Sequence, residues 1–547
     1  MSQPGITADT IAAAEPLAGI EFSAAERTQI LAKIDEKIDW LRACRRFVPE
    51  NGLGPATVFD PRLPGMDILP QDGGFTPSDA PPPPLPEQDI DIAFAPLTTL
   101  AGWLREGAIT SSRLTALYLE RIERIGPTLE CTVTVTRDLA IAQAAEADRE
   151  IAAGLYRGPL HGIPWGAKDL LDTAGIATTW GAAPYRDRMP TRDAAVVRRL
   201  HDAGAVLIAK TTLGALAFGD IWFGGRTRNP WHIDEGASGS SAGSASATAA
   251  GLVGFAIGTE TLGSIVSPCE RCGVTGLRPT FGRVSRAGAM ALSWSLDKIG
   301  PICRAVEDSA LVLDTLNGYD AADPGSIDMP FAYHAGRSVK GLRLGYSPAW
   351  FEGDQATDVD RAALSAAQAI GLELVEITLP DLPYDSLMTI LDADCAAAFE
   401  ELTLSGRDDL LVRQDDEAWP NLFRTAHLIP AVAYVQVERL RRAVMIAMAD
   451  VFQGIDAMIG STPEGAMLTI TNFTGQPSLT LPAGFLERPL LGDGTLSRDA
   501  PSKSGPKHRM PQGITLWGRL FDEDTLCAIG MALEAHFNLA NQRPPTG

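Results

Sequence analysis

The sequence is poor in cysteine and contains no long apolar run. Seven cysteines are scattered over 547 residues, an odd number that excludes a fully paired disulfide framework and is typical of a reducing compartment. Residues 1–20 contain acidic side chains and lack a basic start followed by an apolar core, which argues against a secretory signal. No stretch of about 18 apolar residues occurs, so we expect no membrane span and a cytoplasmic location.

Basic residues are scarce relative to acidic ones. The chain has 46 Lys and Arg against 68 Asp and Glu, which gives a formal net charge of −22 at pH 7. Nucleic-acid-binding proteins usually present a basic surface to phosphates, so we expect no nucleic-acid partner. A small neutral or cationic substrate suits this charge better, and acidity that serves only solubility is the open alternative.

Patterns that bind metals or cofactors are also few. Cys269 and Cys272 form a C-x-x-C pair, but no second pair accompanies it, as a zinc site of this type requires. The run from Gly204 to Lys210 lacks the second glycine of a phosphate-binding loop. We therefore expect neither a metal nor a cofactor.

Two serine- and glycine-rich clusters carry most of the functional information. They span Gly239–Ser244 and Thr259–Ile265, and upstream the run His161–Asp169 places Lys168 among apolar and glycine residues. A serine hydroxyl needs a base to take its proton as it attacks, and a lysine serves only when it is neutral. Lowering a lysine pKa from ~10.4 to about 7 requires roughly 4–5 kcal/mol of destabilisation of the ammonium, which apolar neighbours provide. The pattern indicates a serine nucleophile that is activated without histidine.

A second interpretation of the first cluster is less favoured. Gly239–Gly243 fits the G-x-S-x-G elbow of α/β-hydrolases, with Ser241 as the nucleophile. That elbow requires a strand directly before it, and residues 226–237 are not predicted to form one.

Ordered motifs over roughly residues 90–547 resemble the amidase signature family. The family's core reads approximately G-G-S-S-G-G-S, T-D-x-G-G-S-I and C-G-x-x-G-L-K-P-T. The matching segments in this chain are Gly239–Ser244, Thr259–Ile265, Cys272–Thr280, Gly282–Ser285, Ser295–Pro301, Val306–Asp308 and Asn472–Pro477. This resemblance implies a single mixed β-sheet wrapped by helices, which agrees with the alternating helix and strand patterns along the chain.

The resemblance also implies roles for individual residues. Ser264 would be the acyl-accepting nucleophile, Ser240 the bridging serine and Lys168 the base, with a cis peptide bond between Gly239 and Ser240. The oxyanion hole would be formed by the backbone N–H groups of Thr261, Leu262, Gly263 and Ser264. Leu262 stands where many members have glycine, and its side chain would narrow the site.

Aromatic residues near these motifs are candidates for the substrate pocket. Trp and Phe surfaces suit the aryl or alkyl groups that flank an amide, and small residues allow the backbone to approach a substrate closely. The predicted substrate-binding residues are Trp165, Trp180, Gly239, Trp222 and Phe223. For each aromatic residue, a place in the hydrophobic core is an equal alternative.

Residues 1–88 precede the region of resemblance and are predicted to form a separate extension, with residues 89–547 as the catalytic domain. Apolar residues at helical spacing predict an amphipathic helix over 25–46, and Pro81–Pro86 predicts a stiff spacer. The apolar stripe of the helix should be covered by the catalytic domain or by a second copy of the chain, so a homodimer is an open alternative.

These observations predict a metal-free amidase that cleaves the C–N bond of carboxamides through an acyl-enzyme. Aryl amides, peptide-terminal amides, esters and carbamates are all compatible substrates. Two alternatives stay open: the glutamine-hydrolysing component of a tRNA-dependent amidotransferase, and a catalytically silent binding protein of the same fold. The segment Lys210–Leu216 departs from the K-T-N-x-x-E-F sequence usual in that amidotransferase component.

Overall fold

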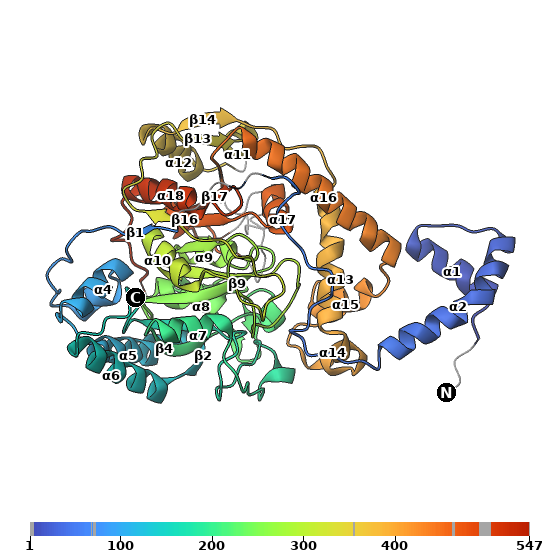
Figure 1. The fold of residues 1–547 in the computed structure, drawn as a ribbon, viewed down its shortest axis with the longest axis horizontal. Helices are drawn as coiled ribbons and strands as arrows, with labels where there is room; N and C mark the ends of the chain where they lie inside the picture. The colour runs from blue at the N-terminus through green and yellow to red at the C-terminus, as the bar shows by residue number, and fades with distance from the viewer. Residues whose placement is uncertain are drawn as a thin grey trace.

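The computed structural model describes residues 5–66, 68, 73–353, 356–461, 465–491 and 505–545. Within this part of the chain, eleven strands form one twisted sheet in the order β14-β13-β15-β17-β16-β10-β11-β9-β3-β4-β2 (Figure 1). The strands are β2 Thr132–Val135, β3 Pro164–Lys168, β4 Val206–Thr211, β9 Phe255–Glu260, β10 Thr275–Arg278, β11 Lys298–Cys303, β13 Arg343–Tyr346, β14 Glu373–Glu376, β15 Ala457–Ser461, β16 Ser478–Arg488 and β17 His508–Gly518. The other strands form two-stranded pairs: β1 Phe75–Thr76 with β12 Tyr333–His334, β5 Ile221–Trp222 with β6 Gly225–Arg226, and β7 Arg228–Asn229 with β8 His232–Gly236.

The large sheet is mixed, which confirms the predicted α/β class. Strand β3 pairs parallel with both β4 and β9, whereas β9 and β11 pair antiparallel. All residues of β3, β4 and β9 are buried, because helices cover both faces of the sheet. No helix among the described residues is long and apolar enough to cross a membrane.

The helices surround the sheet, apart from the two nearest the N-terminus (Figure 1). They are α1 Ala8–Ala18, α2 Ala24–Cys44, α3 Asp89–Ala93, α4 Leu97–Arg105, α5 Ser111–Leu129, α6 Arg137–Ala152, α7 Ala195–Asp202, α8 Ala242–Ala249, α9 Val266–Cys272, α10 Val306–Leu316, α11 Pro348–Glu352, α12 Asp358–Ala369, α13 Met388–Ala398, α14 Glu400–Leu404, α15 Trp419–Ala426, α16 Ala431–Gln453, α17 Gly465–Thr474 and α18 Glu523–Phe537.

The first two helices form a hairpin that projects away from the sheet (Figure 1). Helix α2 matches the predicted helix over 25–46, whereas α1 was not predicted. Arg27 of α2 donates two hydrogen bonds to the Glu15 carboxylate of α1 and joins the two helices. The expectation that the catalytic domain covers the apolar stripe is wrong, because α2 has no buried residue and Trp40 and Leu41 are exposed.

The chain between this hairpin and α3 runs along the catalytic domain. Phe59 packs edge-on against Phe281, and β1 pairs with β12. The indole N–H of Trp103 on α4 donates to the carbonyl of Pro83. The predicted spacer at 81–86 therefore lies against the body of the protein.

Candidate active site

Lys168 ends strand β3 and is completely buried. Its Nζ lies 2.8 Å from Ser240 Oγ, 3.0 Å from Ser241 Oγ and 2.8 Å from Thr259 Oγ1. Burial lowers the pKa of Lys168 from its usual value to about 7, although the Asp297 and Glu260 carboxylates oppose this effect. The lysine therefore reaches its neutral form near physiological pH, as the proposed base must.

Ser240 and Ser241 precede helix α8, at the end of the chain segment that approaches Lys168. The Gly239–Ser240 peptide bond is cis, as the family resemblance implies. The Ser241 hydroxyl donates to the Thr259 carbonyl (3.0 Å) and accepts from the Thr259 N–H (3.1 Å), and its side chain is completely buried. Ser241 thus joins α8 to β9, and this geometry does not favour it as the nucleophile of a hydrolase elbow.

Ser264 lies in the connection between β9 and α9. Its side chain is 7% exposed, whereas Ser240 and Ser241 are almost fully enclosed. Its carbonyl accepts a hydrogen bond from the Ser241 N–H at 3.1 Å. Across the described residues, no hydrogen bond involves the Ser264 hydroxyl. The hydrogen bond between Lys168 and Ser240 in the predicted relay is therefore present, whereas the one between Ser240 and Ser264 is not. Hydrogen bonds between catalytic groups often shorten only when substrate binds.

The segment Thr261–Ser264 presents consecutive backbone donors. None of its four N–H groups has a hydrogen-bond partner within the part of the chain that the structure describes. Gly263 adopts φ +85°, a conformation that favours glycine and turns the backbone here. Backbone donors without a partner next to a serine are available to stabilise a tetrahedral oxyanion.

The Glu260 carboxylate holds this segment in place. Its Oε2 accepts from the N–H groups of Ile265 (2.8 Å) and Val266 (3.0 Å), and its Oε1 accepts from Arg278 (2.6 Å). Burial alone would raise the pKa of Glu260, but Arg278, the Val266 N–H and Lys298 outweigh it and lower the pKa to about 2. Glu260 is therefore an ionised anchor directly before residues 261–264.

Asp297 supports the same segment from the other side. The Thr261 hydroxyl donates to Asp297 Oδ1 at 2.6 Å, while Oδ2 accepts from the N–H groups of Leu292 and Ser293 at 2.8 and 3.1 Å. Burial raises the pKa of Asp297 against these hydrogen bonds. Asp297 lies in a family motif, but the resemblance implied no role for it, and its contact with Thr261 appears only in the folded chain.

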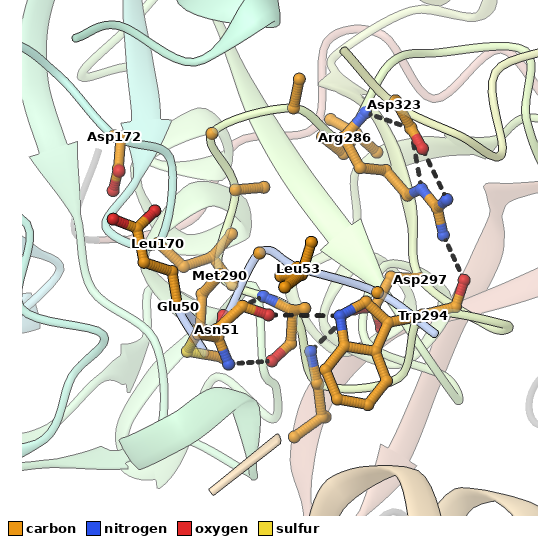
Figure 2. A pocket seen from close by; sticks show the side chains of 18 of the residues that line it. Glu50, Asn51, Leu53, Leu170, Asp172, Arg286, Met290, Trp294, Asp297 and Asp323 are labelled. Atoms are coloured by element: carbon orange, nitrogen blue, oxygen red, sulfur yellow. Dashed lines mark hydrogen bonds and ion pairs between the residues drawn. The ribbon is translucent and has the colours of Figure 1, made fainter. Parts of the chain in front are cut away.

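A cavity of about 780 Å³ opens beside this centre; Asp297 is one of its lining residues, whereas Lys168, Ser240 and Ser264 are not. Thr259 and Thr261 line its inner part together with Leu170, Trp180 and Ala217. Its outer wall is formed by residues 50–58 of the N-terminal extension, which we call the strap (Figure 2). The strap was not predicted as part of the site.

Of the predicted pocket residues, only Trp180 lines the cavity. Trp165 is buried in strand β3 and stacks on Phe255 at a centroid distance of 6.1 Å, so its assignment to the pocket was wrong. Trp222 and Phe223 pack against each other at 4.9 Å, away from the cavity wall. At Gly239, an added Cβ would lie 1.9 Å from the Gly219 carbonyl oxygen. Glycine is therefore required here by close packing of the backbone, and no contact with a substrate is needed to explain it.

The cysteine pair is part of the core. Cys269 and Cys272 are both buried in α9, and burial raises the pKa of each thiol. Within the described ranges, no group of three or more His, Cys, Asp or Glu side chains is arranged to hold a metal ion.

Comparisons with known proteins agree with this geometry. The family model described as Amidase matches residues 113–427, a range that contains Lys168 and both serine clusters. The A subunit of the glutamyl-tRNA(Gln) amidotransferase of Hahella chejuensis is 31% identical over 488 residues, covering 82% of this chain and 99% of the relative. The corresponding protein of Roseiflexus sp. is 34% identical, covering 79% of this chain and 94% of that relative.

The solved structure of a native peptide amidase from Stenotrophomonas maltophilia is also similar. It is 30% identical with a TM-score of 0.68, over 82% of this chain and 98% of that one. The chain belongs to the amidase signature family and is an enzyme that hydrolyses amide C–N bonds.

Proposed function

We propose that the protein hydrolyses carboxamides through an acyl-enzyme formed on Ser264. The observation that carries the proposal is the buried Lys168, whose amine lies 2.8 Å from Ser240 Oγ and whose pKa is lowered by burial to about 7. A neutral amine accepts the Ser240 proton while Ser240 takes the proton of Ser264. Ser264 Oγ then forms a bond to the substrate carbonyl carbon, and the carbonyl π-electrons move onto oxygen.

Collapse of this intermediate completes acylation. The free N–H groups of residues 261–264 would stabilise the oxyanion. The lone pair on oxygen re-forms the C=O bond, the C–N bond breaks, and the proton held by Lys168 returns through Ser240 to the leaving amine. Water then attacks the ester by the same relay, and Ser264 regains its proton as the carboxylic acid leaves.

A second candidate is the glutamine-hydrolysing component of a tRNA-dependent amidotransferase, in which ammonia passes to a partner protein. The names of the amidotransferase relatives favour it. Lys210 and its neighbours argue against it, because the segment 210–216 lacks the K-T-N-x-x-E-F sequence. The intact Lys168, Ser240 and Ser264 disfavour a catalytically silent binding protein.

The decisive experiment is a substrate screen of the purified chain alone, with anilides, peptide amides, esters, carbamates and glutamine compared side by side. We expect turnover of anilides or peptide amides without any partner and loss of at least ~10³-fold in Ser264→Ala. Ser246→Ala is the matched control, because this buried α8 serine bonds the Arg228 carbonyl instead of the catalytic lysine. Glutaminase activity that appears only with a partner protein would favour the amidotransferase component instead.

A further inference from the structure

The strap lines the cavity that opens beside the candidate active site. Eight of its nine residues line the cavity, which continues inward to Thr259 and Thr261. Thr259 bonds the catalytic lysine and Thr261 begins the oxyanion segment. A substrate whose carbonyl sits beside Ser264 and whose arm fills the cavity would therefore reach the strap.

Asn51 fixes the strap to the catalytic domain. Its Nδ2 donates to the Ala291 carbonyl at 2.9 Å, its Oδ1 accepts from the Ala291 N–H at 2.7 Å, and its carbonyl accepts from the Trp294 indole at 3.2 Å. Figure 2 shows Asn51 and Trp294 together at the wall of the cavity. Gly54 lies against the same indole, where an added Cβ would stand 3.1 Å from Trp294. The wall is thus held in one position before any substrate binds.

Large apolar side chains lie exposed around this wall. Leu53 of the strap is 58% exposed, Val58 is 45% exposed and Met189 is 55% exposed; all three line the cavity. Covering such side chains with an apolar group removes their surface from water, which favours binding. Among the charged residues that line the cavity, Asp172 is paired with Arg188 and Asp323 with Arg286. Glu50 of the strap and Arg192 also line it and carry opposite charges, so the apolar side chains of the strap are the feature that favours an apolar arm.

The strap also lies outside the region that resembles the family. The Hahella chejuensis protein is matched over 99% of its own length by 82% of this chain. The remaining share of this chain is close to the size of residues 1–88. The substrate preference of the relatives therefore does not predict what the strap selects.

We infer that the strap is a specificity element, and that Leu53 and Val58 bind an apolar arm of an amide substrate during hydrolysis at Ser264. This inference rests on the proposed function, because it assumes that the reacting carbonyl lies beside Ser264. The substrate class is then an amide that carries an extended alkyl or aryl arm on one side of the scissile bond. A compact amide such as glutamine leaves the strap uncontacted.

Two homologous series test the inference and find which side of the bond carries the arm. One is the p-nitroanilides of straight-chain acids from acetyl to octanoyl, and the other is N-alkyl benzamides from methyl to octyl. In at least one series, kcat/KM of the wild type should rise with chain length. Leu53→Ala should lose roughly 10-fold in kcat/KM for the longest member and change little for the shortest.

Leu155→Ala is the matched control, because Leu155 is 54% exposed but does not line the cavity. A second variant, Asn51→Ala, removes the hydrogen bonds that hold the strap to Ala291. It should reduce the ratio of kcat/KM for the longest substrate to that for the shortest. Labelling of each variant by a small fluorophosphonate reports separately on Ser264. Two results would overturn the strap's role alone, provided that labelling is normal. One is that Leu53→Ala and Leu155→Ala have the same kcat/KM for every chain length, and the other is that kcat/KM of the wild type does not depend on chain length. Absence of labelling at Ser264 in the wild type would overturn the proposed function as well.

Discussion

The candidate active site, which we call the centre, and the N-terminal hairpin differ in how many of their side chains have hydrogen-bond or packing partners. Lys168, Ser240 and Ser241 are buried and joined by hydrogen bonds between segments far apart in sequence. In the hairpin, Glu15 is the one buried residue of α1, and α2 has none. Both regions follow their local sequence patterns, but only in the centre do long-range contacts fix the conformation.

Substitutions in the two regions should therefore differ in their effects on stability and turnover. A buried polar group that loses its partner costs about 1–3 kcal/mol or alters the group's pKa. An exposed helix contributes little beyond its own stability. We therefore expect steep effects on turnover at the centre, intermediate effects in the shell around it and small effects in the hairpin.

Among the substitutions that test this contrast, replacement of Lys168 should reduce turnover most. We expect Lys168→Met to reduce kcat/KM by ~10²–10⁴-fold, since the variant cannot take the proton of Ser240. In the wild type, kcat/KM should rise as pH increases through about 7, because the pKa of Lys168 is lowered to that value and only the neutral amine accepts a proton. Initial rates measured from pH 5 to 9 check both expectations.

Lys168→Arg is the control for charge and hydrogen bonding. It keeps donors at this position but has no neutral form in this pH range, so its rate should be as low as that of Lys168→Met. A near-normal rate in either variant below pH 7 would break the proposed link between burial and base catalysis.

An intermediate effect is expected for Asp297→Asn. The substitution disturbs the carboxylate that accepts from Thr261, Leu292 and Ser293, so we expect kcat to fall roughly 10-fold, less than for loss of an oxyanion donor itself. The Asp297 charge raises the pKa of Lys168. Its removal should therefore move the acid limb of the pH–rate profile to lower pH.

Asp308→Asn provides a matched comparison. Asp308 is also buried, and burial raises its pKa to about 7, but it accepts from the Leu97 N–H, away from the catalytic lysine. The Asp308→Asn variant should leave the acid limb of the pH–rate profile at its wild-type position. Equal shifts in the two variants would show that Asp297 acts only through general stability.

The smallest effect on catalysis should come from deletion of residues 1–44. Among the described residues, the ion pair that joins the end of this hairpin to the catalytic domain is Arg45–Glu400, and the deletion retains both partners. We expect kcat/KM to stay within about 2-fold of the wild type, because exposed elements contribute little to the packed core. Deletion of 1–88 also removes the strap and the contacts of Phe59 and Pro83, so thermal unfolding should occur at a lower temperature.

Sizing chromatography of the same two truncations tests the homodimer, which the sequence left as an open alternative. In a homodimer, a second copy would cover the exposed Trp40 and Leu41 of α2. If the hairpin carries this contact, deletion of 1–44 should change the measured mass from that of a dimer to that of a monomer. A large loss of activity on deletion of 1–44 would contradict the contrast between hairpin and centre.

Much of the fold, and part of the geometry of the candidate site, was predictable from the sequence. The helix predicted at 25–46 matches α2, Ala24–Cys44, because a helix depends mainly on local periodicity. The contact of Lys168 with Ser240 was also predicted, although 72 positions separate them, because the family motifs record that proximity. The cis bond at Gly239–Ser240 followed from the same resemblance.

The remaining features depend on tertiary contacts that no local pattern encodes. Trp165 was assigned to the pocket from its closeness to Lys168 in sequence, but it packs on Phe255 inside the sheet. Asn51 meets Ala291 across 240 positions, and it lies in a segment outside the family resemblance. The strap could therefore be identified only once the folded chain placed it beside the cavity.

The most direct test of the central claim is to map the covalent adduct of the wild-type protein. After reaction with a fluorophosphonate at pH 8, where Lys168 is largely neutral given its pKa of about 7, the protein is digested and the modified peptide is sequenced by tandem mass spectrometry. We expect a single adduct on Ser264, and much slower labelling in Lys168→Met. An adduct on Ser241 in place of Ser264 would contradict the proposed mechanism.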